Sequence, residues 1–117
     1  MSLRKEIFEQ PTAIRRLLEM QIDAVKEIAA RIRDHNGSFV YLAARGTSDN
    51  AGLYAKYLWG INNQMPVALA APSMFSVFKK PPKIGQALIV GISQSGQSPD
   101  IVSVIEEGRR QGCLLYT

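Results

Sequence analysis

Short hydroxyl and amide side chains are concentrated between residues 93 and 98, and they suit this stretch to ligand binding. The candidate ligands are Ser93, Gln94, Ser95 and Ser98. These groups donate hydrogen bonds without carrying a charge, and Gly96 allows a positive φ or a close backbone approach by a ligand. Ser98 is a good N-cap residue and Pro99 fits the first position of a helix, so free helical N–H groups are expected beside the hydroxyls. The combination is typical of a phosphate site that needs no lysine.

The segments around this loop favour an anion site over an ordinary turn, although serine, glycine and proline are also common turn residues. An unbroken apolar run at 87–92 precedes the loop and is typical of a buried parallel strand. The arrangement occurs a second time upstream, where the apolar run 39–44 leads into the loop 45–50. A helix is expected to follow at once, capped by Ser48 or Asp49. Because ligands of open α/β sheets bind beyond the carboxyl ends of the strands, the two loops are expected to form one pocket.

The order of predicted elements gives a doubly wound parallel α/β sheet. Residues 1–36 are predicted to form an N-terminal arm, extended or loosely ordered over 4–10, and one long amphipathic helix from about Pro11. The sheet domain is predicted over 37–117 and is expected to be incomplete at its C-terminus, after the start of a fourth strand. Predicted strands are 39–44, 65–71, 87–92 and one from Cys113; predicted helices are 49–59, which ends at Gly60, 72–78 and 99–110, which ends before Gly112.

Composition narrows the function classes. The chain has 117 residues, 46% of them hydrophobic, and a formal net charge of +4. No apolar run approaches the roughly 20 residues of a membrane span, and no signal-peptide pattern is present, so a cytoplasmic location without membrane contact is expected. The basic residues form no dense stripe with interleaved aromatics, which argues against nucleic-acid binding. The single Cys113 is interpreted as a buried small hydrophobic residue rather than a nucleophile, and neither a metal site nor a cofactor is predicted.

Two motifs carry a family resemblance. GlyThrSer at 46–48 and SerGlnSerGlyGlnSer at 93–98 resemble the phosphosugar loops of the sugar-isomerase (SIS) domain. GluIlePheGluGlnPro at 6–11 is similar to the entry of the isomerase half of glucosamine-6-phosphate synthase and of type II glucosamine-6-phosphate deaminases. The resemblance spans the chain and implies a flavodoxin-like fold of three layers, α/β/α, of which this chain would be the first part of the first SIS domain.

The resemblance also implies a ligand, a six-carbon sugar phosphate of the fructose 6-phosphate or glucosamine 6-phosphate class. It assigns the phosphate to Ser93, Gln94, Ser95 and Ser98, and further substrate contacts to Gly46, Thr47 and Ser48. Three residues depart from the aminotransferase pattern: Gln97 replaces Glu, Ser98 replaces Thr, and Met74 replaces an acidic residue. These departures favour the deaminase or isomerase relatives, and a homodimer is expected.

The implied reaction is an aldose–ketose isomerisation, in which a base moves a proton between C1 and C2. In the relatives the base lies in a second domain or the C-terminal tail, so no catalytic residue is assigned here and this chain alone is expected to be inactive. An alternative is the sugar-phosphate-sensing domain of a transcriptional regulator. Such a protein would carry a helix-turn-helix segment upstream, whereas one long helix is predicted there. A second alternative is a different nucleotide-binding α/β domain. Such a domain would need a Gly-x-Gly-x-x-Gly loop or a Lys-Ser/Thr phosphate loop, and the sequence contains neither.

Overall fold

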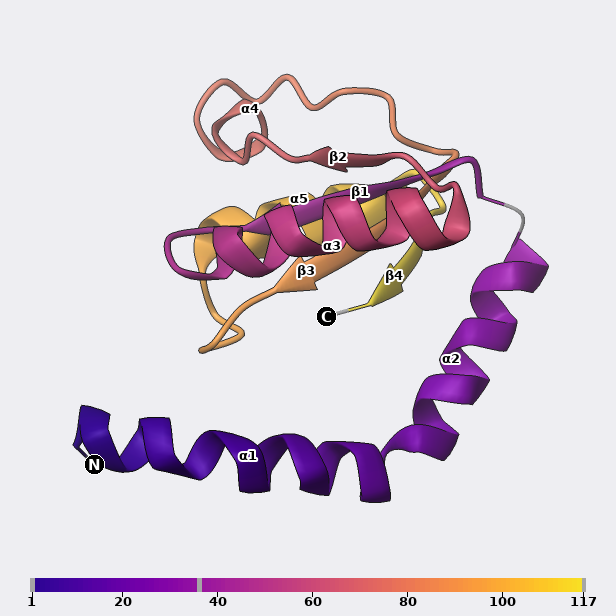
Figure 1. Cartoon of the computed structure of the whole chain (residues 1–117). Coiled ribbons are helices and arrows are strands. Elements are labelled where there is room, and N and C mark those ends of the chain that lie inside the picture. Colours follow the sequence, from indigo (N-terminus) through magenta and orange to yellow (C-terminus); the bar gives the residue numbers. More distant parts are fainter. Residues whose placement is uncertain (1, 36, 117) are drawn as a thin grey trace. The chain divides into compact units, whose positions relative to one another are not determined.

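The computed structural model describes residues 2–35 and 37–116, and it divides the chain into two compact units, Met1–Asp34 and His35–Thr117. Figure 1 shows the elements of both. No helix in the described part of the chain is long and apolar enough to cross a membrane. Nor do the described side chains include a group of three or more His, Cys, Asp or Glu residues placed to hold a metal ion.

The N-terminal unit consists of α1 (Leu3–Met20) and α2 (Ile22–His35). The extended arm predicted for residues 4–10 is helical instead, because Ser2 caps α1: its hydroxyl accepts the Lys5 N–H at 3.2 Å. Pro11 lies inside α1, and the single long helix expected from that residue is interrupted at Gln21, where φ is −114°. Neither helix contains a buried residue among those described.

The C-terminal unit is built on a four-stranded parallel sheet in the order β2-β1-β3-β4. Its strands are β1 (Phe39–Ala44), β2 (Val67–Leu69), β3 (Ala87–Ile92) and β4 (Leu114–Tyr116). Its helices are α3 (Ser48–Asn63), α4 (Ser73–Ser76) and α5 (Pro99–Arg110). The parallel α/β fold predicted from the sequence is confirmed, and the two long strands coincide with the apolar runs at 39–44 and 87–92.

Helices cover both faces of the sheet, as a doubly wound fold requires (Figure 1). The face that carries Tyr41 and Ile89 forms the core cluster together with Phe75 of α4 and Ile101 and Val104 of α5. On the opposite face, Gly52 of α3 lies against Leu42 and Leu69. Side chains alternate between faces along each strand, so both faces can be apolar only in runs such as PheValTyrLeuAlaAla.

Helix ends differ in part from the prediction. α3 continues through Gly60 to Asn63 and stops where Gln64 takes a left-handed conformation with φ of +53°. α5 ends as predicted before Gly112, whose φ is +83°. The N–H groups of Gly112 and Cys113 then bond the carbonyls of Arg109 and Gly108.

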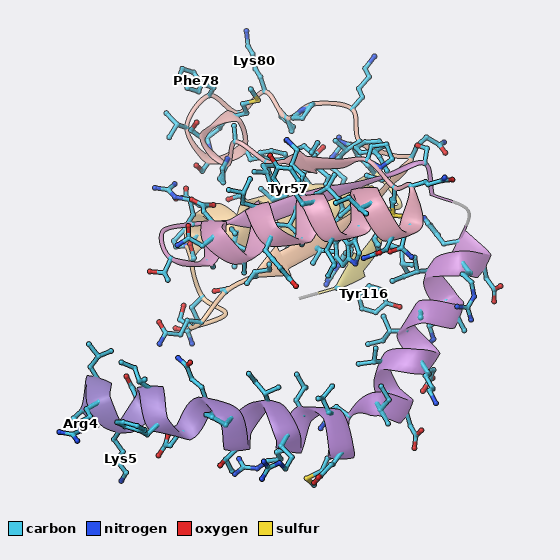
Figure 2. All side chains as sticks on the ribbon, in the orientation of Figure 1. Arg4, Lys5, Tyr57, Phe78, Lys80 and Tyr116 are labelled. Carbon is cyan, nitrogen blue, oxygen red and sulfur yellow. The ribbon has the colours of Figure 1, made fainter. Side chains whose placement is uncertain are left out.

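The segment after α4 is fixed to the end of α5. Phe78 and Lys80 project away from the sheet (Figure 2). Further along the segment, the Gln111 side chain forms hydrogen bonds with the backbone of Pro82 and Ile84. Its amide donates to the Pro82 carbonyl at 3.0 Å and accepts the Ile84 N–H at 2.7 Å. The half-buried Cys113 thiol donates to the Ile84 carbonyl at 3.0 Å, and burial raises the pKa of this thiol, consistent with a packing role.

Candidate functional site

The two predicted loops lie side by side at the carboxyl edge of the sheet. β1 and β3 are neighbouring parallel strands whose last residues, Ala44 and Ile92, are paired, so loops 45–48 and 93–98 leave the sheet together. Between them lies a cavity of about 250 Å³. Its lining residues are Arg45, Thr47, Ser48, Ser93, Gln94, Ser95, Ser98 and Ile101. Six of the seven predicted site residues are therefore brought together, and Gly46, with φ of +61°, is not among the lining residues.

Internal hydrogen bonds hold the serine loop in shape. The Ser93 hydroxyl accepts the Gly96 N–H at 2.9 Å, and the Ser95 hydroxyl accepts the Gln97 N–H at 3.1 Å. Gly96 has a φ of +71°, as its position in the loop predicted. A hydroxyl that accepts a hydrogen bond keeps its own proton for donation. Both serines can therefore shape the loop and donate to a ligand at the same time.

Ser98 and Pro99 begin α5 in the predicted positions, but Ser98 caps the helix only through its backbone. Ser98 has the extended conformation of an N-cap residue, Pro99 follows it, and the Ser98 carbonyl accepts the Val102 N–H. The Ser98 side chain makes no capping hydrogen bond. The Ser98 hydroxyl therefore forms no hydrogen bond with the first-turn N–H groups of α5. Both the hydroxyl and these N–H groups remain available to a ligand in the cavity.

The first loop is closed in a way that the sequence did not indicate. The Ser48 hydroxyl accepts the Arg45 N–H at 3.1 Å and donates to the Arg45 carbonyl at 2.6 Å. The expectation that Ser48 or Asp49 caps the helix is wrong, because α3 begins at Ser48 and Thr47 occupies the cap position without a side-chain bond. Ser48 therefore fixes the turn from which Thr47 and Arg45 reach the cavity.

Arg45 is a lining residue that sequence reasoning did not single out. Its Nη1 lies 2.5 Å from Oδ2 of Asp100, in the first turn of α5. The other carboxylate oxygen, Oδ1, accepts the Ser76 hydroxyl of α4 at 3.0 Å. Arg45 stands directly after the first apolar run, and this place at a strand end was the only sequence signal that could have marked it.

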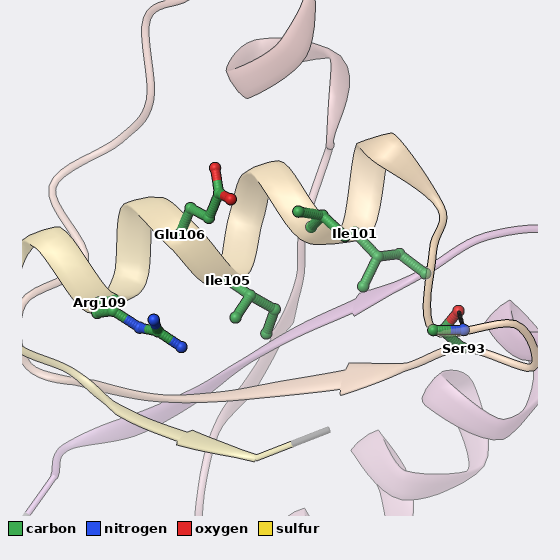
Figure 3. Close-up of a pocket in the computed structure, with 7 residues that line it drawn as sticks. Ser93, Ile101, Ile105, Glu106 and Arg109 are labelled. Carbon is green, nitrogen blue, oxygen red and sulfur yellow. Dashed lines mark hydrogen bonds between the residues drawn. The ribbon is translucent and has the colours of Figure 1, made fainter.

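A second cavity, of about 230 Å³, lies along α5 and shares Ser93 and Ile101 with the first. Figure 3 shows Ile101, Ile105, Glu106 and Arg109 on the helix beside it. Ile101 and Ile105 approach Gly91 of β3, where an added Cβ would lie 3.3 Å and 3.2 Å from them. This cavity is more apolar in its walls than the first, and none of the predicted ligands except Ser93 faces it.

Comparison with known proteins adds to this geometry. No family model matches the chain. It is 36% identical to the glutamine–fructose-6-phosphate aminotransferase (isomerizing) of Geobacillus kaustophilus over 97% of its length, and 33% identical to that of Thermosynechococcus vestitus over 92%. A solved structure of a "putative phosphosugar isomerase" from Silicibacter pomeroyi superimposes with a TM-score of 0.89 and 39% identity over 96% of the chain.

The resemblance to the sugar-isomerase family is confirmed. It holds in sequence and in fold, and it extends over nearly the whole chain. The SIS-like chain spans 19% of the length of each of these two curated relatives and 34% of the solved chain. The activities in the relatives' names are those of much longer proteins.

Proposed function

We propose that this chain supplies the phosphosugar-binding part of a SIS-type enzyme, and that its ligand is a hexose 6-phosphate of the fructose 6-phosphate or glucosamine 6-phosphate class. One observation carries the proposal: two loops from different parts of the sequence line one polar cavity at the carboxyl edge of a parallel sheet. The names of the relatives add the ligand class, since they contain fructose 6-phosphate or phosphosugar.

In this proposal the serine loop holds the phosphate. Ser93, Ser95 and Ser98 donate hydroxyl protons, Gln94 donates its amide, and the first turn of α5 adds the positive end of a helix. Thr47 and Ser48, on the facing loop, contact the sugar. Hydrogen bonds to a charged group contribute about 1.5–3 kcal/mol each, so the phosphate would supply much of the affinity.

The reaction of the whole protein is proposed as an aldose–ketose rearrangement of the bound sugar. Moving a proton between C1 and C2 needs a base close to the carbon-bound proton. The side chains that line the cavity are hydroxyls, an amide, a guanidinium and an isoleucine. We therefore assign these loops to substrate binding and place the base elsewhere in the protein. No observation favours the alternative role as a sensor domain of a transcriptional regulator, and a cytoplasmic location remains part of the proposal.

Titration calorimetry tests the binding role. The chain is titrated with fructose 6-phosphate, glucosamine 6-phosphate and unphosphorylated fructose, and only the two phosphates are expected to bind measurably. A crystal soaked with fructose 6-phosphate should show the phosphate within hydrogen-bonding distance of Ser93, Ser95 or Ser98. Equal affinity for fructose and its phosphate, or a ligand bound away from both loops, would refute the proposal.

A further inference from the structure

Arg45 is the one charged side chain among the residues that line the first cavity. It follows Ala44, the last residue of β1, so a short backbone path fixes it to the sheet. Its side chain is 54% exposed, which keeps the guanidinium accessible to a ligand that enters the cavity. A guanidinium has five N–H donors in a planar fork and loses its proton at no ordinary pH.

Asp100 and Ser76 hold this guanidinium in place. Asp100 uses Oδ2 to bind Arg45 and Oδ1 to accept the Ser76 hydroxyl, so both carboxylate oxygens are occupied. The contacts join three segments of the sheet domain: the loop after β1, α4, and the first turn of α5. An arginine that is already positioned loses less side-chain entropy when it binds a ligand.

Only part of the donor capacity of Arg45 is used. Within residues 2–35 and 37–116 its side chain makes one hydrogen bond, from Nη1 to Asp100. The remaining donors are thus open to a second acceptor, and a phosphate group offers oxygens at a spacing that matches the guanidinium fork. Asp100 alone would oppose an anion at the N-terminus of α5, and pairing with Arg45 offsets that negative charge.

We propose that Arg45 binds the phosphate directly and determines the preference of this cavity for phosphorylated over neutral sugars, with Asp100 and Ser76 as positioning residues. The proposal rests on the proposed function, because it takes the cavity to be the phosphosugar site. It adds one charged side chain to a set of cavity-lining residues that is otherwise neutral.

Four variants of the chain test this role by titration with fructose 6-phosphate, inorganic phosphate and fructose. Arg45→Met should lower the affinity for fructose 6-phosphate and for inorganic phosphate by about tenfold or more, the loss expected for one charge-assisted hydrogen bond. Any binding of fructose should stay unchanged. Arg45→Lys, which keeps the charge without the fork, should lose less. Arg110→Met removes the same charge outside the cavity and should bind like the wild type. The double variant Arg45→Met/Asp100→Asn removes the unpaired Asp100 charge as well, so it should regain only part of the lost affinity and stay clearly weaker than the wild type.

Each outcome separates the possibilities. Wild-type affinity in Arg45→Met, with binding intact in the wild type, would overturn this inference and leave the proposed function standing. Recovery of full wild-type affinity in the double variant would also overturn it, because Arg45 would then serve only to neutralise Asp100. Failure of the wild type to bind fructose 6-phosphate would overturn both proposals. Thermal unfolding of each variant verifies the fold, and should Arg45→Met fail to fold, a loss of phosphate affinity in folded Arg45→Lys supports the inference and wild-type affinity there overturns it.

Discussion

Ser98 occupies the N-cap position of α5 without using its side chain to cap the helix. Replacement of an N-cap serine by alanine usually costs about 1 kcal/mol, but here the lost hydroxyl makes no capping bond. We expect Ser98→Ala to weaken fructose 6-phosphate binding by roughly tenfold and to change the melting temperature very little. Calorimetric titration and thermal unfolding measure the two quantities.

Ser103 provides the matched control for that substitution. It lies on the same helix, outside the cavity lining, and its hydroxyl donates to the Pro99 carbonyl at 2.7 Å. Ser103→Ala should leave affinity unchanged. If Ser98→Ala and Ser103→Ala bind fructose 6-phosphate equally well, Ser98 is not a ligand.

At the scale of the element, two glycines of α3 should respond in opposite directions to alanine. A Cβ at Gly52 would lie 2.8 Å from Cδ2 of Leu42, a side chain only 1% exposed, so Gly52→Ala should cost about 1–3 kcal/mol through overpacking. A Cβ at Gly60 would meet nothing within 4 Å, and Gly60→Ala should add roughly 0.5–1 kcal/mol through helix propensity. Urea unfolding of both variants checks the prediction, and a neutral Gly52→Ala would mean that α3 shifts readily on the sheet.

Glu107, in the C-terminal turn of α5, should make the free energy of unfolding fall at acidic pH. Hydrogen bonds from Arg110, and then from Gln111, lower the pKa of Glu107 from its ordinary value of 4.5 to about 2. Because the folded-state pKa is depressed, the stabilisation is present above the unfolded-state value and is lost as pH falls from 4.5 toward about 2. Protonation would also loosen Gln111, which holds the Pro82 and Ile84 backbone.

Unfolding midpoints measured across that pH range test the prediction. Glu107→Gln should unfold with a weaker dependence on pH than the wild type. Glu106→Gln is the control, since the Glu106 carboxylate makes no hydrogen bond to the described residues, and its profile should match the wild type. A wild-type profile in Glu107→Gln would contradict the assigned role.

At the scale of the whole molecule, we predict a homodimer. The outer side of α3 carries a stripe of apolar side chains that are 41–75% exposed: Leu53, Tyr54, Tyr57, Leu58 and Ile61. Soluble monomers rarely expose large contiguous apolar patches, and such a patch usually marks a site of protein–protein contact. Sedimentation velocity should show a dimer, and Tyr57→Lys should shift it toward monomer whereas Lys56→Ala should not. A monomer at all concentrations would contradict the prediction.

The sequence by itself determined the sheet and the location of the candidate site. The apolar runs at 39–44 and 87–92 are long enough and uninterrupted enough to be buried on both faces, and each ends sharply in polar residues. The helices predicted between the strands indicated that the strands run parallel. Parallel strands place the loops after β1 and β3 at the same edge of the sheet. Local chemistry also sufficed for Gly96, whose positive φ no other residue type adopts as readily, and for the end of α5 before Gly112.

Only the tertiary structure decided how the site is held together. Arg45 and Asp100 are 55 residues apart, and Ser76 comes from a third segment, so their contacts arise from packing that no local pattern encodes. The same holds for Ser48, whose hydroxyl bonds the Arg45 backbone rather than the helix it was expected to cap. Glycine disfavours a helix interior by only about 1 kcal/mol. α3 therefore continues past Gly60, because the hydrogen bonds of a helix already anchored on the sheet outweigh that cost. Local preferences select the elements, and the larger energies of packing between distant segments fix their ends and their side-chain partners.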